Sequence, residues 1–134
     1  MIFSSLGRYK DVALLLIRLG LGTMFILHGW PKIRGGPEMW QGLGAAMGNL
    51  GVTAVPVLWG FLAALSEFGG GICLVLGFAF RPACLIMMFT MIVATMHHLM
   101  GGDGLMTASH AIENGVMFLG LFLLGPGKYS VDKK

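Results

Sequence analysis

Residues 66–82 read SEFGGGICLVLGFAFRP, and they place a carboxylate, Glu67, at the start of a run that carries no further charge until Arg81. In a water-soluble protein this run would be a core helix with an unexplained acid. The composition excludes that class, because 56% of the 134 residues are hydrophobic and 11% are charged. Such a chain has too little polar surface to coat a soluble globule. We therefore interpret the run as part of a membrane-spanning helix that carries a buried acid.

The rest of the chain contains further apolar runs of similar length. Four can be recognised, at residues 12–30, 55–79, 82–100 and 109–124. At a rise of about 1.5 Å per residue, each covers or nearly covers a hydrocarbon layer of about 30 Å. The runs are continuous rather than alternating, which indicates helices and not β-strands. The sequence thus predicts an all-α membrane protein, a single domain over residues 1–134 built as a bundle of four transmembrane helices.

The connections between these runs differ in length. The first, residues 31–54, is long and rich in glycine, and apolar side chains recur in it at near-helical spacing. These are Trp40, Leu43, Met47 and Leu50. The spacing predicts a short amphipathic helix on the outer surface, with Trp40 at the depth of the lipid headgroups, or a cap packed over the bundle. The second connection is expected to be a tight turn with Pro82 in the first turn of the next helix.

Basic residues near the ends of the spans predict the orientation of the chain. Six of them fall on one side: Arg8, Lys10, Arg81, Lys128, Lys133 and Lys134. Lys32 and Arg34 fall on the other side. Both termini are therefore expected in the cytoplasm, and in a bacterium the membrane would be the inner one. Arg18 interrupts the first apolar run, so we interpret this run as a retained span and not as a cleaved signal.

Glu67 can be placed on its helix from the residues at helical spacing around it. These residues are all small: Gly60, Ala63, Ala64, Gly70 and Gly71. Small residues mark the face where transmembrane helices approach closely, so Glu67 is expected to point into the bundle. A buried carboxylate needs a partner or a proton. Arg18 is the candidate partner, either in a structural ion pair or beside a protonatable Glu67 in a proton or substrate path.

A second group of polar residues lies near the outer ends of the helices. It contains the four histidines and one acid: His28, His97, His98, His110 and Glu113. Histidine titrates near neutral pH and hydrogen-bonds to carbonyl oxygens, which suits a quinone head group. The alternatives are ordinary boundary residues, a metal site of His110 and Glu113 with His98 or His28, and a haem site. Adjacent histidines on a helix project about 100° apart, so one site is expected to use only one of His97 and His98.

Several segments together resemble the DoxX family of small membrane proteins. They are LIRLGLGTMFILHGWPK at 16–32, EFGGGICLVLGFAFRP at 67–82, HHLMGGDG at 97–104 and ENGVMFLGLFLLGPGKYSVD at 113–132. The residues that match the family pattern are Arg18, Gly22, His28, Gly29, Lys32, Glu67, Gly70, Gly71, Gly77, Arg81, His98, Glu113, Gly125, Pro126, Gly127 and Asp132. The resemblance implies a four-helix fold, and relatives linked to thiosulfate:quinone oxidoreduction and membrane redox complexes. It also favours His98 over His97.

The leading functional hypothesis is a membrane subunit of a quinone-linked redox complex. Under this hypothesis an outer-side pocket for a quinone is lined by His28, His98, His110 and Glu113. We assign no metal site. The chain carries no flavin, nucleotide or phosphate-binding motif, so it would be at most one subunit of an oxidoreductase, with electrons supplied by a partner protein. The alternative is a non-catalytic scaffold for other membrane or peripheral subunits, and a small proton-coupled transporter using Glu67 fits less well. We expect no nucleic-acid partner.

Overall fold

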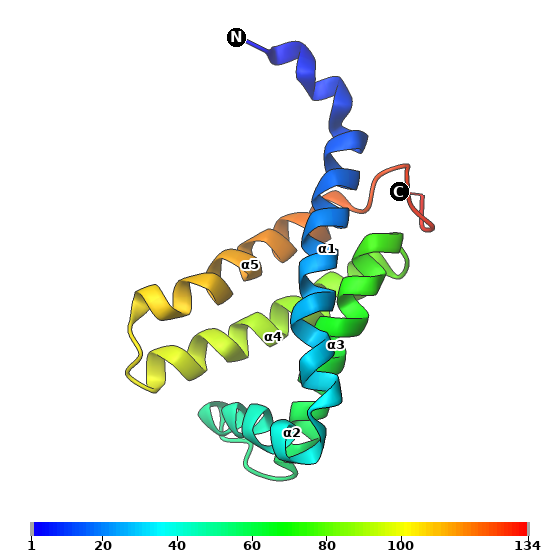
Figure 1. The fold of residues 1–134 in the computed structure, drawn as a ribbon. Helices are drawn as coiled ribbons and strands as arrows, with labels where there is room; N and C mark the ends of the chain where they lie inside the picture. Colours follow the sequence, from blue (N-terminus) through cyan, green and yellow to red (C-terminus); the bar gives the residue numbers. More distant parts are fainter. Residues whose placement is uncertain (1, 134) are drawn as a thin grey trace.

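A computed structural model describes residues 2–133 and shows a helical protein (Figure 1). Within these residues the chain forms α1 (Lys10–Arg34), α2 (Gly36–Gly44), α3 (Pro56–Leu76), α4 (Phe80–Met100) and α5 (Leu105–Leu124). Two short 3₁₀ helices, η1 (Ser4–Tyr9) and η2 (Ala45–Leu50), precede α1 and follow α2. No strand occurs in the described part of the chain.

The four predicted spans are confirmed as α1, α3, α4 and α5, which are long and apolar enough to cross a membrane. The largest departures from the expected bounds are in α1, α3 and α5, and α3 ends at Leu76 rather than at 79. α1 continues through Pro31 to Arg34, because a proline near the end of a helix removes a backbone hydrogen bond without preventing another turn. α5 begins at Leu105, directly after a glycine turn, rather than at 109.

The turns follow from local backbone chemistry. α3 ends at Gly77, whose φ of 67° is a left-handed conformation that glycine adopts without strain. Pro82 lies in the first turn of α4, as expected, where its missing N–H has no helical acceptor to lose. The tight turn between α3 and α4 therefore reverses the chain, so that α4 begins beside the end of α3.

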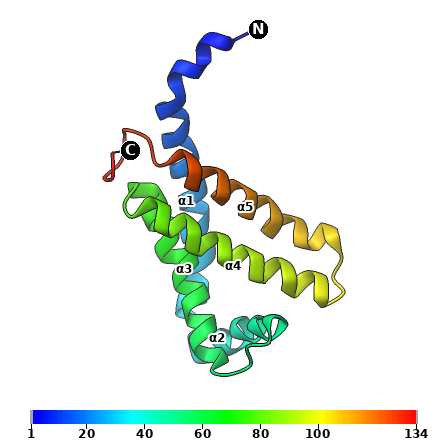
Figure 2. The same ribbon diagram turned by 180° about the vertical axis from the view of Figure 1, so that it is seen from behind.

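The helices form two antiparallel pairs that diverge (Figures 1 and 2). In one pair α1 lies along α3, and in the other α4 lies along α5. The pairs approach each other where residues 125–133 pack, which we call the tail end. They separate toward the opposite end, which we call the α2 end, where α2 packs on α3 and η2 contacts α4. The α2–η2 segment thus lies across the opening between α3 and α4.

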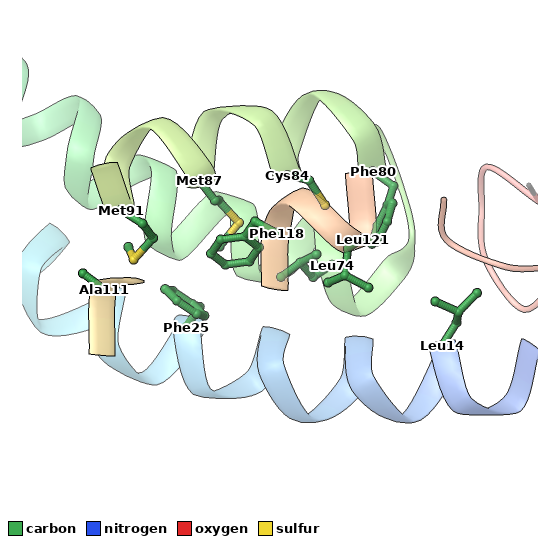
Figure 3. Packing of buried hydrophobic residues seen from close by; sticks show 10 residues of the cluster. All are labelled: Leu14, Phe25, Leu74, Phe80, Cys84, Met87, Met91, Ala111, Phe118 and Leu121. Carbon is green, nitrogen blue, oxygen red and sulfur yellow. The ribbon is translucent and has the colours of Figure 1, made fainter. Parts of the chain in front are cut away.

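The apolar core lies where the two pairs meet (Figure 3). Phe25 of α1 contacts Phe118 of α5, with ring centroids 5.2 Å apart. Leu74, Phe80 and Met87 complete the centre of this cluster and are almost fully buried. The second pair is therefore held against the first largely by side chains at the tail end and in the middle of the helices.

The small residues of α3 allow three different neighbours to approach. A methyl group added to Gly71 would lie 2.7 Å from the carbonyl oxygen of Gly22 on α1. One added to Gly70 would overlap Met87 of α4, and one added to Gly60 would overlap the backbone of Trp40 on α2. Ala64 is fully buried, while Ala63 is half-buried.

The short helix expected in the first connection is confirmed as α2, and it is packed against the bundle. The ring of Trp40 lies 4.9 Å from that of Phe61, and its Nε1 donates to the carbonyl oxygen of Lys32 at 2.9 Å. Gly44 also lies directly against the backbone of Pro56. These contacts correspond to the cap over the bundle.

Residues 125–133 are fastened to the turn between α3 and α4. The N–H groups of Val131 and Asp132 donate to the carbonyls of Leu76 and Gly77 at 3.1 and 2.9 Å. The Asp132 carboxylate accepts the backbone N–H groups of Ala79 and Phe80 at 3.2 and 2.8 Å. A carboxylate in this position satisfies N–H groups at a helix start that have no helical partner, so the tail caps α4.

The basic residues used to predict the orientation separate between the two ends as expected. Arg8, Lys10, Arg81, Lys128 and Lys133 lie at the tail end. Lys32 and Arg34 lie at the end of α1 beside α2. Lys134 lies outside the described residues.

Candidate functional site

Arg18 is buried in α1 with 1% of its surface exposed, but it does not pair with Glu67. Its Nε and Nη2 donate to the carbonyls of Leu74 and Val75 at 2.9 and 3.0 Å. Its Nη1 donates to the carbonyls of Pro126 and Tyr129 at 3.0 and 2.9 Å. Arg18 therefore joins the end of α3 to the tail, because the fork of guanidinium donors can serve several carbonyls at once.

Glu67 instead forms an ion pair with Lys32, whose Nζ lies 2.7 Å from Oε2. The reason is the register of the antiparallel helices α1 and α3. Gly22 lies beside Gly71 and Gly29 beside Phe68, so Glu67 is level with the α2 end of α1. The carboxylate is thus far along the helix from Arg18, while the long side chain of Lys32 can reach back to it.

The ion pair predicts a measurable coupling between its two residues. Lys32→Met is expected to destabilise the protein by about 1.5 kcal/mol, because Glu67 loses a charged hydrogen-bond donor. Adding Glu67→Gln to the same chain should recover most of this loss, since the amide needs no counter-charge. Thermal unfolding of the single and double variants in detergent measures this coupling. Additive losses in the double variant would contradict it.

The residues of the predicted outer-side pocket all lie toward the α2 end of their helices, but they fall into two groups. His28 of α1 and His110 of α5 face each other, with ring centroids 6.3 Å apart. His98 of α4 instead pairs with Asp103, with 2.9 Å between Nδ1 and Oδ2. Glu113 is exposed on α5. Among residues 2–133, no three His, Cys, Asp or Glu side chains are close enough to hold a metal ion.

A cavity of about 790 Å³ lies between α3 and α4, with the α2–η2 segment across one end. His98 borders it, and so does His97, although their side chains leave the helix about 100° apart. Both can reach the same cavity because α3 and α4 diverge at this end. Both histidines thus border one cavity, and the expectation that a site would use only one of them stays a prediction.

The cavity has two chemically different parts. The polar arm lies at the α2 end and is bordered by Lys32, Trp59, Glu67, His97 and His98. The apolar arm continues toward the tail end and is bordered by Gly69, Cys73, Ala79, Pro82 and Ile86. A hydrogen bond of 2.9 Å between the hydroxyls of Ser66 and Thr90 joins α3 to α4 between the two arms.

Trp59, one of the residues that border the polar arm, carries an unsatisfied donor. Nε1 of Trp59 is buried and has no hydrogen-bond partner among the described residues. A buried N–H without a partner is costly, so such groups are uncommon in folded proteins unless they serve a ligand or a bound water. Sequence reasoning missed both Trp59 and the ion pair to Lys32. The pair depends on the register of α1 against α3, which the sequence of either helix alone does not give.

Comparison with known proteins identifies relatives and a family for the chain. The chain is similar to the inner membrane protein YqjF of Escherichia coli, with 34% identity over 94% of each chain. It is also similar to the inner membrane protein YphA of the same organism, with 33% identity over 96% of this chain and 94% of the relative. No solved structure matches it. The sequence model of the DoxX family matches residues 13–99, which include α2, α3 and most of α1 and α4. The chain is therefore a member of the DoxX family.

Proposed function

We propose that this protein is a quinone-binding membrane subunit of a redox complex, and that the cavity between α3 and α4 is its quinone site. The observation that carries the proposal is the unpartnered N–H of Trp59, a residue that borders the same cavity as the Lys32–Glu67 pair. A quinone head group is flat, neutral and apolar at its edges, and its carbonyl oxygens accept hydrogen bonds. The polar arm supplies donors of the matching kind.

Several residues of the polar arm can form hydrogen bonds with such a head group. Trp59 can donate from its indole N–H, and Lys32 can donate with the protons that Glu67 does not accept. His97 and His98 border the same arm and can donate or accept. The volume of about 790 Å³ is in the range of small-molecule sites, so the cavity is large enough for the ring and part of a chain.

The proposal also assigns a location and an orientation. The E. coli relatives are inner membrane proteins, and basic residues predominate at the tail end. The tail end would therefore face the cytoplasm and the α2 end the opposite side of an inner membrane. The polar arm would then lie near the outer surface. Electrons would reach a bound quinone from a partner subunit that carries a redox cofactor.

Trp59→Phe tests the head-group site directly. The variant keeps the aromatic bulk and removes the N–H, so quinone affinity is expected to fall about 2- to 10-fold. The measurement is equilibrium binding of a short-chain benzoquinone to the purified protein in lipid nanodiscs. The loss should appear with no decrease in thermal stability, because the donor has no partner within the described protein to lose.

Trp30→Phe is the matched control, because Trp30 is exposed and packs on Phe68 outside the cavity. It should bind the quinone as the unsubstituted protein does. If the unsubstituted protein binds no quinone at all, or if Trp59→Phe binds it with unchanged affinity, the proposal fails. Co-purification of a protein assembly without quinone would then favour the scaffold hypothesis.

A further inference from the structure

We propose, building on the quinone function above, that the cavity opens sideways to the bilayer between α3 and α4. Its apolar arm would hold the polyisoprenoid chain of the quinone. Position 69 would then determine whether a long chain can be accommodated. The proposal rests on the edges of the cavity, on the free space at Gly69 and on the charge balance of the polar arm.

The edges of the cavity expose apolar side chains on both helices. Leu65 of α3 is 44% exposed, and Ile86 and Phe89 of α4 are 56% and 50% exposed. All three border the cavity and also reach the outer surface of a helix that crosses the membrane. The side of the cavity therefore faces hydrocarbon, and a lipid-soluble molecule can enter without passing through water.

Gly69 is a position on α3 where this side of the cavity has free space. A methyl group at Gly69 would meet the protein at one point, the Cδ1 atom of Leu65 at 3.8 Å, which is an ordinary contact. The next residue differs, because a methyl group at Gly70 would overlap Met87. Gly70 thus lies in the close contact between α3 and α4, whereas Gly69 borders free space in the apolar arm.

The charges of the polar arm favour a neutral head group over a phosphate. Lys32 borders the arm, but its ammonium is already neutralised by Glu67 at 2.7 Å. An anionic phospholipid head would bring a second negative charge close to Glu67, whereas a quinone brings carbonyl acceptors and no charge. The occupant inferred is therefore a quinone and not a phospholipid.

The length of the cavity suits a chain-bearing molecule. The α3 residues that border it run from Trp59 to Cys73, which span about 21 Å of helix. A chain gains little free energy by moving from lipid to an apolar arm, because both are hydrocarbon. The hydrogen-bond donors of the polar arm therefore supply the affinity. The apolar arm supplies the space through which the chain extends into the bilayer.

Gly69→Leu tests this path. The leucine is expected to fill the apolar arm and weaken binding of a long-chain polyisoprenoid benzoquinone about tenfold or more, equal to about 1.4 kcal/mol. A benzoquinone with the same head group and a single isoprene unit should bind as before. Equilibrium binding to protein in nanodiscs is measured for both quinones. Ile86→Trp narrows the arm from α4 and should give the same selective loss if Gly69→Leu fails to fold.

Gly20→Leu on α1 is the control, because Gly20 has open space around it and does not border the cavity. It should bind both quinones normally. Equal binding of the two quinones to Gly69→Leu would overturn the chain path while leaving the head-group site intact. Loss of a co-purified phospholipid from Gly69→Leu, with both quinones bound normally, would also overturn it. Failure of the unsubstituted protein to bind either quinone would instead overturn the proposed function.

Discussion

An Arg18→Met variant is expected to be about 3 to 5 kcal/mol less stable than the unsubstituted protein. Methionine fills similar space, but it leaves the carbonyls of Val75, Pro126 and Tyr129 without the guanidinium donors. The carbonyl of Leu74 loses one donor and keeps the backbone N–H of Gly77. Each buried acceptor left unpaired costs about 1 to 3 kcal/mol. The sum stays at the lower end of three such costs because the tail can move and expose the carbonyls of Pro126 and Tyr129 to water.

Two measurements follow this loss. Thermal unfolding in detergent reports the stability, and limited trypsin digestion at Lys128 reports whether the tail has detached. Arg18→Lys should restore a small part of the loss, because one ammonium cannot reach four carbonyls in the way a planar guanidinium fork does. Arg8→Met is the matched control, because Arg8 is exposed and contacts Tyr9. An Arg18→Met protein that is as stable and as resistant to trypsin as the control would contradict the assignment.

Gly44→Ala is expected to destabilise the protein by about 3 kcal/mol, at the upper end of overpacking costs. The added methyl group would overlap the backbone of Pro56 and lie 2.7 Å from the backbone nitrogen of Gly60. A backbone cannot move aside as a flexible side chain can. The α2 helix must therefore shift from α3, and the end of the cavity that it covers should open.

Gly42→Ala provides a closely matched control on the same short helix. A methyl group at Gly42 meets nothing within 4 Å, so this variant should unfold at or slightly above the temperature of the unsubstituted protein. Proteolysis within residues 45–55 measures release of the segment that follows α2. Similar stability of the two variants would show that α2 is not locked to α3 in the way the structure indicates.

The helices could be predicted from the sequence because the bilayer restricts the backbone of an apolar span to a helix. Long uncharged runs have no alternative to a helix in a bilayer, so the spans follow directly from residues such as those at 82–100. The bounds were less certain, since Pro31 reads as a stop signal although α1 passes through it. The angle between the two helix pairs could not be predicted, because it depends on how Phe25, Phe118 and Met87 interlock.

The candidate site was harder to predict than the fold. The burial of Glu67 could be derived from its small neighbours, but its partner depends on the register of α1 against α3. That register is set by the approach of Gly22 to Gly71, which spacing along one helix does not reveal. Trp59 gave no sequence signal, because an indole in a transmembrane run is usually a packing or interfacial residue.

The contacts of Arg18 also place the completion of the bundle late in biosynthesis. A nascent chain emerges with α1 first, and its arginine enters the membrane when α3 and the tail have not yet been made. Two of the four acceptors, at Pro126 and Tyr129, leave the ribosome after all four spans. Until then the insertion machinery, lipid headgroups or water must solvate that cation. Closure of the tail end of the bundle is therefore a post-insertion event that requires the last-made residues.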